Sequence, residues 1–319
     1  MPPASPPQVP WYKNAILGPM VLGEAPIFRA SDSTLHWVAP LKEPAELHIL
    51  TLDSSSLSPI GEAKTFVLED SVTVVCFRKG VKGSYICAYY QGVAFLDEET
   101  GKLQVVKEII PTAERAELRF NDGAVDAKGR FWLAEIDKKA AAMGPGNIPS
   151  DYKPRGRLWR YDPDGSLHQM ESGVICGNGV GWSPDNKTMY FNDSVGQKTW
   201  AYDFDLESGA ISNRRDFADF SGGSGEPDGL VVDTDGNVWM AVYGSSRIMV
   251  FDPAGKRVRD VVLAAKAVTC PTWGGRNNDV LFATTAQDKS AGAEDEGGHV
   301  FRYNPPAGTR GTPKHEFGG

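Results

Sequence analysis

The sequence predicts an all-β fold, a six-bladed β-propeller with four-stranded antiparallel blades around a central metal-binding channel. Its main evidence is a pattern that recurs six times: an apolar run, a turn with Asp, Asn or Gly, an aromatic-bearing strand, and a second apolar run ending near Asp. An aromatic residue marks each copy, at steps of 48, 47, 58, 49 and 43 residues: Trp37, Tyr85, Trp132, Tyr190, Trp239 and Phe282. This period fits one blade per copy, whereas a large sandwich or barrel, the alternative, gives no reason for it.

The copies follow one another along nearly the whole chain. Short strands rich in Val, Trp, Tyr and Phe, separated by turns such as DPDG, SPDN and DTDG, predict antiparallel sheets. The copies begin at APIFRASDSTLHWV (25–38), VTVVCFRKGVKGSYICAYY (72–90), NDGAVDAKGRFWLAEI (121–136), NGVGWSPDNKTMYFND (178–193), DGLVVDTDGNVWMAVY (228–243) and PTWGGRNNDVLFATTA (271–286).

We expect a single domain over residues 1–319, with the propeller at about 18–305. Residues 1–15 and 305–319 are Pro- and Gly-rich tails, and one of them could supply a strand that closes the ring. The longest step contains an insertion at residues 137–156. A loop of this length is usually functional or disordered, so it is a candidate lid.

Composition excludes several functions. The net charge is −8 and Lys/Arg blocks are absent, which argues against binding nucleic acid, where affinity comes from neutralising phosphates. No apolar stretch is long enough to span a membrane, and prolines at the start argue against a signal peptide, so we expect a cytoplasmic protein. We also expect a monomer. The four cysteines lack a CxxC pair and are predicted to be reduced core thiols, a bridge between Cys76 and Cys87 being the alternative.

One position of the repeat carries side-chain oxygens in several copies. Counting back 11 to 13 residues from each marker aromatic gives Glu24, Val74, Asn121, Asn178, Asp228 and Pro271. Because the innermost strand of each propeller blade lines the central channel, residues of equal phase are expected to converge there. The alternative is that the Asn-Gly and Asp-Gly pairs are ordinary turn dipeptides.

The converging side chains suit a metal ion. Two carboxylates, Glu24 and Asp228, with the amides Asn121 and Asn178, form a hard-oxygen site of the kind that binds Ca²⁺, Mg²⁺ or Mn²⁺. Oxygen ligands accept several ions, so Zn²⁺ and Fe²⁺ also stay open. The sequence contains no GxSxG, GxxxxGK[ST] or HExxH motif that would indicate another chemistry.

Five segments carry a family resemblance: GEAPIF (23–28), RFNDGAVDAKGRFW (119–132), GNGVGWSPD (177–185), SNRR (212–215) and EPDGLVVDTDGNVWMA (226–241). They resemble the senescence marker protein 30/gluconolactonase (regucalcin-like) family. The resemblance implies a six-bladed propeller with one divalent cation, the metal ligands Glu24, Asn178 and Asp228, and substrate contacts at Arg119 and Asn121. Arg119 enters only through the resemblance, and the alternative role for it is an ion pair with Glu117.

The resemblance implies a metal-dependent hydrolase that opens a lactone ring, most simply of a sugar (aldono-) lactone. The metal would polarise the carbonyl and activate water, with Asp228 as the base or as a group that orients the water. Lys138 and Lys139 stand where the family's sugar lactonases carry a substrate-contacting Glu. The alternatives are therefore a biosynthetic hydrolase or cyclase, a phosphotriesterase-like enzyme acting on a bulkier apolar substrate, and a non-catalytic propeller that binds a partner.

Overall fold

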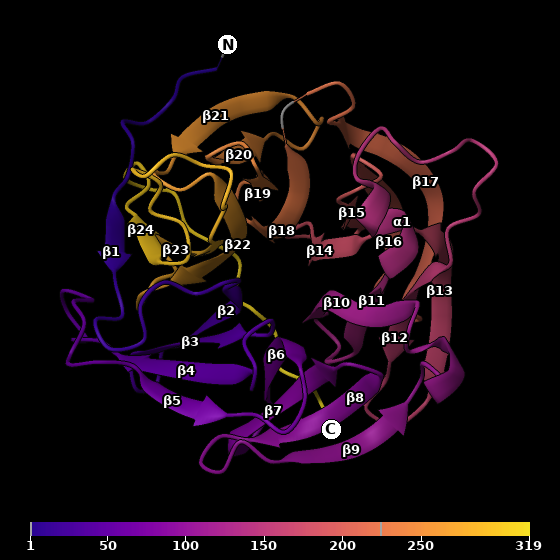
Figure 1. Cartoon of the computed structure of the whole chain (residues 1–319), viewed down its shortest axis with the longest axis horizontal. Coiled ribbons are helices and arrows are strands. Elements are labelled where there is room, and N and C mark those ends of the chain that lie inside the picture. The colour runs from indigo at the N-terminus through magenta and orange to yellow at the C-terminus, as the bar shows by residue number, and fades with distance from the viewer. Residues whose placement is uncertain (1, 224) are drawn as a thin grey trace. The chain divides into compact units, whose positions relative to one another are not determined.

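The computed structural model describes residues 2–223 and 225–319, which form six four-stranded antiparallel sheets. The fold class is the predicted six-bladed β-propeller, and each sheet is one blade (Figure 1). The chain divides into two compact units, and each holds three blades. We describe the units separately, and the single domain over residues 1–319 stays a prediction.

Unit 1 comprises the chain up to Ser71 together with Asp228–Lys314. It holds blades 1, 5 and 6, in which the first strand of blade 6 packs beside strands of the other two blades. Its strands, in sheet order, are β2 (Glu24–Arg29), β3 (Thr34–Ala39), β4 (Glu46–Thr51) and β5 (Lys64–Val67); β18 (Glu226–Val232), β19 (Val238–Tyr243), β20 (Arg247–Phe251) and β21 (Arg257–Val262); and β22 (Ala267–Gly274), β23 (Val280–Ala286), β24 (Val300–Tyr303) and β1 (Pro10–Tyr12).

Unit 2 comprises Val72–Pro227 and His315–Gly319, so it includes the first two residues of β18. It holds blades 2, 3 and 4, and the first strand of blade 3 packs between the first strands of its neighbours. Its elements are β6 (Val72–Arg78), β7 (Val81–Tyr89), β8 (Gly92–Asp97) and β9 (Leu103–Glu108); η1 (Thr112–Glu114), β10 (Leu118–Val125), β11 (Phe131–Asp137), α1 (Lys138–Met143), β12 (Gly156–Tyr161) and β13 (Leu167–Val174); and β14 (Gly177–Trp182), β15 (Thr188–Asp193), β16 (Lys198–Asp205) and β17 (Ala210–Asp219).

Both tails take part in blades. Near the start of the chain, β1 pairs antiparallel with β24, with Pro10 opposite Phe301, so the N-terminal tail supplies the fourth strand of blade 6. This confirms the expectation that a tail contributes a strand. At the other end, Phe317 exchanges backbone hydrogen bonds with unit 2, accepting from Lys79 N at 2.8 Å and donating to Phe77 O at 2.9 Å.

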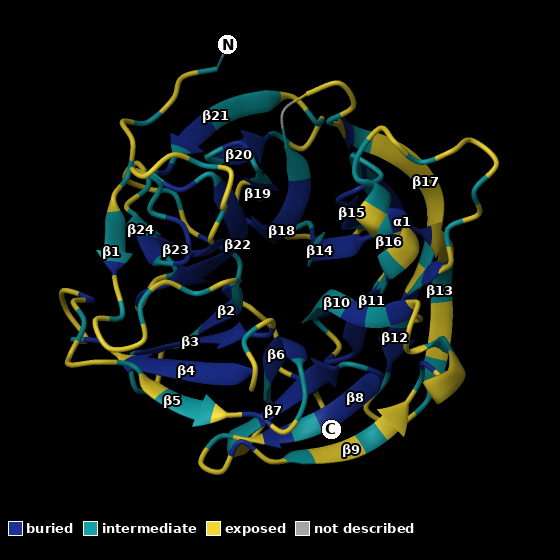
Figure 2. Cartoon of the chain, in the orientation of Figure 1, coloured by how far each residue is buried: buried dark blue, intermediate teal, exposed yellow. Residues whose placement is uncertain are grey.

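The marker aromatics of the repeat lie on the second strand of each blade, and each is 3% exposed or less. This confirms the repeat phase. The outer strands of unit 2 are far more exposed, as β9 and β17 show in yellow in Figure 2. Burial therefore falls from the first strands to the last, as expected when each sheet packs its inner strands against neighbouring blades.

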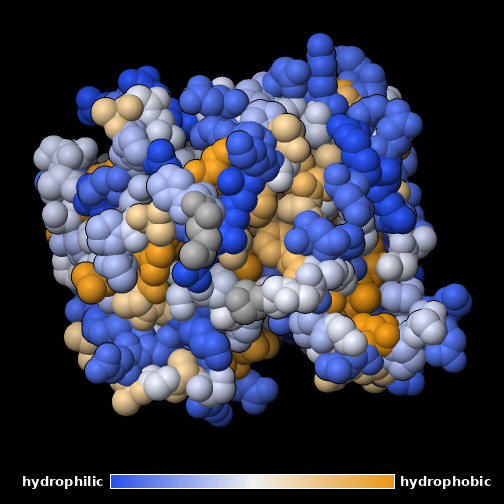
Figure 3. Space-filling view, turned by 90° about the horizontal axis from the view of Figure 1, so that it is seen from above, coloured by the Kyte–Doolittle hydropathy of each residue, from blue (hydrophilic) through white to orange (hydrophobic). Residues whose placement is uncertain are grey.

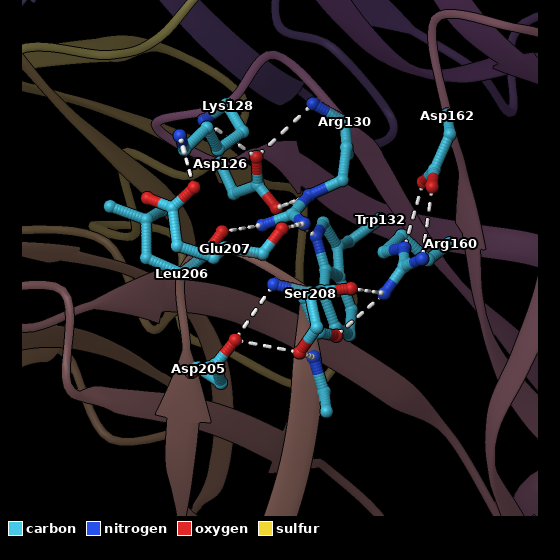
Figure 4. Close-up of polar contacts among 12 residues, drawn as sticks. Asp126, Lys128, Arg130, Trp132, Arg160, Asp162, Asp205, Leu206, Glu207 and Ser208 are labelled. Atoms are coloured by element: carbon cyan, nitrogen blue, oxygen red, sulfur yellow. Dashed lines mark hydrogen bonds and ion pairs between the residues drawn. The ribbon is translucent and has the colours of Figure 1, made fainter.

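Within unit 2, two arginines fasten blade 3 to blade 4 (Figure 4). Arg130 Nη2 donates to Leu206 O at 2.8 Å, and Arg160 Nη1 donates to Gly209 O at 2.7 Å, in the turn between β16 and β17. Asp126 Oδ2 accepts from Arg130 Nε at 2.7 Å, and Asp162 Oδ1 accepts from Arg160 Nε at 2.7 Å. Each guanidinium is thus neutralised on one side while it satisfies backbone carbonyls on the other.

All four cysteines are free and buried, which confirms the prediction of core thiols. Among the residues that the structure describes, no helix is both long and apolar enough to cross a membrane. Hydrophilic side chains predominate on the face shown in Figure 3, where apolar side chains form smaller patches between them.

Candidate metal and substrate site

Every predicted site residue lies on the first strand of a blade. Glu24 begins β2, Arg119 and Asn121 lie on β10, Asn178 lies on β14, and Asp228 lies on β18. The Asn178-Gly179 and Asp228-Gly229 pairs lie inside β14 and β18, near the start of each strand, as the alternative of ordinary dipeptides at strand starts also allows. Register shifts, which turn side chains out of the regular alternation, occur at these residues, between Glu24 and Ile27, Phe120 and Gly123, and Gly177 and Val180.

In unit 1, tight packing places Glu24 and Asp228. The residue before Glu24 is held on both sides, because Gly23 N donates to Thr285 O at 3.1 Å and Gly23 O accepts from Thr269 Oγ1 at 2.6 Å. Asp228 is only 6% exposed. A Cβ at Gly229 would lie 2.5 Å from the Sγ atom of Cys270, so only glycine allows β18 to approach β22 this closely.

In unit 2, a short chain of hydrogen bonds fixes the side-chain amide of Asn178. Asn178 Nδ2 donates to Ser194 Oγ at 2.9 Å, and Ser194 Oγ donates to Pro227 O at 2.7 Å. Because a carbonyl oxygen can only accept, the single hydroxyl proton of Ser194 goes to Pro227, and Ser194 must accept from Asn178. The nitrogen of Asn178 therefore faces Ser194, and Oδ1, which accepts from Gly179 N at 3.0 Å, faces away.

Asn121 reaches from blade 3 to blade 4 of the same unit. Its Nδ2 donates to Gly177 O at 3.0 Å, next to Asn178 in sequence, and lies 3.9 Å from Cys176 Sγ. The structure therefore brings the segments of Asn121 and Asn178 together within unit 2. Nδ2 thus donates to the carbonyl of Gly177 and, more weakly, to the sulfur of Cys176, and among the described residues no group donates to Oδ1, which leaves this oxygen for a ligand.

Arg119 is half-buried on β10, and its side chain has no ion pair or hydrogen bond with any residue that the structure describes. The alternative role for it, an ion pair with Glu117, is wrong, because Glu117 pairs with Arg155. A guanidinium without a protein partner has all of its donors available to an oxygen-rich ligand.

Sequence reasoning missed two buried or half-buried acids of unit 2, Asp193 and Glu226. Asp193 is 2% exposed and accepts from Ile175 N and Cys176 N at 2.9 Å each. Burial raises the pKa of Asp193 above its usual range, although these backbone donors act in the opposite direction. Glu226 also has a raised pKa, first because of burial and then because of the charge of Asp193. Neither a motif nor the repeat spacing in the sequence predicts a role for this pair of acids.

Hydrogen bonds to Asp137 fix the first residues of the insertion at 137–156. Asp137 is 1% exposed, caps α1 by accepting from Ala140 N at 3.0 Å, and accepts from Tyr152 Oη at 2.9 Å. Glu135, fully buried, accepts from Arg157 Nε at 2.7 Å and therefore serves the fold; burial raises its pKa despite that pairing. The function of the insertion as a lid stays a prediction.

The chemistry of the predicted donor set fits a hard divalent cation. Glu24 and Asp228 carry carboxylate oxygens, and because the nitrogen of Asn178 is engaged by Ser194, its oxygen, which also accepts from Gly179 N, is the atom of that amide that could bind a cation. Within the described part of the chain, no group of three or more His, Cys, Asp and Glu side chains could hold a metal ion. The predicted set contains only two side chains of these types, Glu24 and Asp228, beside the amide of Asn178. That absence therefore does not bear on it, and the set stays a prediction.

A family model described as the SMP-30/gluconolactonase/LRE-like region matches residues 22–287. The chain belongs to the SMP-30/gluconolactonase/LRE-like family. Regucalcin of Danio rerio is 30% identical to it over 306 residues, which cover 93% of this chain and 95% of that protein. A Bacillus subtilis protein with the provisional name sugar lactone lactonase YvrE is 30% identical over 301 residues, with 94% and 93% covered.

Solved structures agree with this family assignment at the level of the fold. A luciferin-regenerating enzyme has a TM-score of 0.82 at 25% identity, with 96% of this chain and 98% of that chain covered. A regucalcin from Agrobacterium tumefaciens, described as a calcium-binding protein, has a TM-score of 0.82 at 22% identity, with 99% and 98% covered. The family and the fold class expected from the sequence are both confirmed.

Proposed function

We propose that the chain is a divalent-metal-dependent lactonase that opens the ring of a sugar (aldono-) lactone. The single observation that carries the proposal is the fixed amide of Asn178, whose oxygen is turned away from Ser194 and, beyond the bond from Gly179 N, keeps a lone pair that can bind a cation. Membership of the SMP-30/gluconolactonase/LRE-like family supports a lactonase, and so does the name of the Bacillus relative.

We assign Glu24, Asn178 and Asp228 as the residues that would hold one cation, with Ca²⁺, Mg²⁺, Mn²⁺, Zn²⁺ and Fe²⁺ as candidates. When bound, such a cation polarises the lactone carbonyl and makes water more acidic. Asp228 accepts the proton of the attacking water or orients that water. The water oxygen bonds to the carbonyl carbon, the ring C–O bond breaks, and the proton removed from the water passes to the departing ring oxygen, so that the product is a hydroxy acid.

Arg119 and Asn121 bind the substrate in this proposal. The guanidinium of Arg119 has a planar fork of donors that suits two neighbouring oxygens of a sugar ring or its carbonyl. Asn121 offers its Oδ1 to a substrate hydroxyl, because its Nδ2 already donates to Gly177 O at 3.0 Å and contacts Cys176 Sγ at 3.9 Å. A small molecule rich in oxygen fits both side chains.

The test removes the metal and then the ligands. After exhaustive chelation, each of the five ions is added back and hydrolysis of glucono-δ-lactone is followed by proton release. Asp228→Ala and Asn178→Ala should each abolish metal-dependent turnover while the circular dichroism spectrum stays native. Asn213→Gly, on the exposed strand β17, is the matched control and should act like the parent chain. Unchanged turnover after chelation, or in either ligand variant, would refute the proposal.

A wider panel separates the other functions. Aromatic lactones and phosphotriesters, assayed beside aldonolactones, test for a bulkier apolar substrate, for which the insertion at 137–156 would form part of the pocket. A non-catalytic propeller would instead gain stability from the metal and turn over no member of the panel.

A further inference from the structure

We infer that the Asp193-Ser194 dipeptide, at the end of β15, positions Asn178, the predicted metal ligand of unit 2, with Ser194 as the positioning residue for its side chain. The inference rests on the proposed function and names residues to which neither the sequence nor the comparisons gave a role. It is carried by hydrogen bonds from both residues to the two segments that bear or precede predicted ligands.

The hydroxyl of Ser194 connects two segments that are distant in sequence. It accepts from Asn178 Nδ2 at 2.9 Å and donates to Pro227 O at 2.7 Å, and Pro227 directly precedes Asp228. Ser194 is 5% exposed and Asn178 is 6% exposed, so water is largely excluded from both. One buried hydroxyl therefore sets which atom of the Asn178 amide faces a ligand and also holds the backbone that leads to Asp228.

The backbone around Asn178 is held by the same dipeptide. The Asp193 carboxylate accepts from Ile175 N and Cys176 N at 2.9 Å each, and Ser194 N donates to Cys176 O at 2.9 Å. A carboxylate that accepts from several backbone amides makes strong, directional bonds. The segment that enters β14 is thus fixed two residues before Asn178, and rotation of the Asn178 side chain is then restricted by Ser194.

Another buried hydroxyl in the same blade provides a matched control. Thr199 Oγ1 donates to Asn192 Oδ1 at 2.7 Å, and both residues are fully buried. This pair resembles Ser194 and Asn178 in chemistry and burial, but it involves no predicted ligand. Thr199→Val removes the hydroxyl at nearly constant volume, so it reports the general cost of losing a buried hydrogen bond in blade 4.

The experiment measures binding of Ca²⁺ and Mn²⁺ by isothermal titration calorimetry to the full chain. Ser194→Ala should weaken binding by about 10- to 100-fold, as is usual for residues that orient a metal ligand. Ser194→Thr, which keeps the hydroxyl, should restore most of the affinity, and Thr199→Val should bind as the parent chain does. With saturating metal, the KM of Ser194→Ala for the lactone should be unchanged, because Ser194 contacts no substrate.

Several results would overturn the inference. If Ser194→Ala binds metal as tightly as Thr199→Val does, Ser194 does not position Asn178, while the proposed function stands. If the parent chain binds neither ion, the proposed function fails and the inference fails with it. If Ser194→Ala does not fold, Ser194→Cys, of similar size but a poor hydrogen-bonding group, takes its place in the same comparison.

Discussion

The indole nitrogen of Trp132 donates to Asp126 Oδ2 at 2.9 Å, joining the marker aromatic of blade 3 to the turn that precedes its strand. Blade 5 repeats this bond, with Trp239 Nε1 donating to Asp233 Oδ2 at 2.8 Å. The two aspartates differ in their next partner. Asp126 also accepts from the buried Arg130, whereas Asp233 accepts from the neutral side chain of Asn237.

This difference predicts unequal costs of neutralising the two aspartates. Asp126→Asn leaves the Arg130 guanidinium buried without its charge partner and should lower the free energy of unfolding by about 3–5 kcal/mol. Asp233→Asn loses only neutral partners and should cost about 1–3 kcal/mol. Urea unfolding of both variants measures the difference, and equal losses would show that the charge of Arg130 is not what Asp126 stabilises.

Phe317 supports unit 2 from the end of the chain. Its side chain is 1% exposed and stacks on Tyr161, with ring centroids 5.9 Å apart. Phe317→Ala should cost about 3–5 kcal/mol in the free energy of unfolding, because it opens a cavity that the backbone cannot fill. His315→Ala, two residues earlier, is the control and should cost much less. A loss below 1 kcal/mol for Phe317→Ala would mean that the tail is not packed in solution.

His48, on β4, should make stability depend on pH. Burial, helped by the positive charge of Lys42, lowers its pKa from 6.5 to about 4, and Glu46 Oε2 lies 3.3 Å from its Nε2. In the unfolded chain this histidine binds a proton near pH 6.5, but in the folded chain it stays neutral. Its contribution to stability is therefore present above pH 6.5 and is lost as the pH falls toward 4, by about 3 kcal/mol.

The measurement compares parent chain and His48→Gln by urea unfolding between pH 4.5 and 7.5. The parent chain should lose more stability than the variant as the pH falls through this window. Parallel curves would show that His48 titrates alike in the folded and unfolded states.

Arg119 should affect substrate binding without affecting stability. Since its side chain has no ion pair or hydrogen bond with the described residues, Arg119→Ala should change the free energy of unfolding by less than about 0.5 kcal/mol. In the proposed lactonase its loss should lower kcat/KM by at least about tenfold, mainly through KM. Arg155→Ala, which removes the partner of Glu117, is the charge-matched control and should leave kcat/KM unchanged.

The sequence predicted the repeat well because its signal is local. The marker aromatics lie in short, mostly apolar runs bounded by turn residues, and every blade places its aromatic on the second strand. It also placed the candidate ligands on first strands, because equal spacing from the aromatics implies equal position in the blade.

Other features depend on contacts that spacing does not encode. Ser194 Oγ donates to Pro227 O, 33 residues further along the chain, and no local sequence motif predicts this hydrogen bond. Likewise, the partner of Glu117 is Arg155, in the insertion, rather than Arg119 two positions away. Packing decides which side chains of distant segments pair with each other. The repeat period predicts the strands, but not which of their side chains will meet.

Blade 6 draws β1 from the start of the chain and β24 from near its end, with Pro10 opposite Phe301. β1 is synthesised early and has no partner strand until β24, at Val300–Tyr303, has been made. The order of this blade is therefore completed late, and the long chain segment between the two strands makes this closure slow. Until β1 docks, β24 keeps an open edge, and an unpaired strand edge favours aggregation.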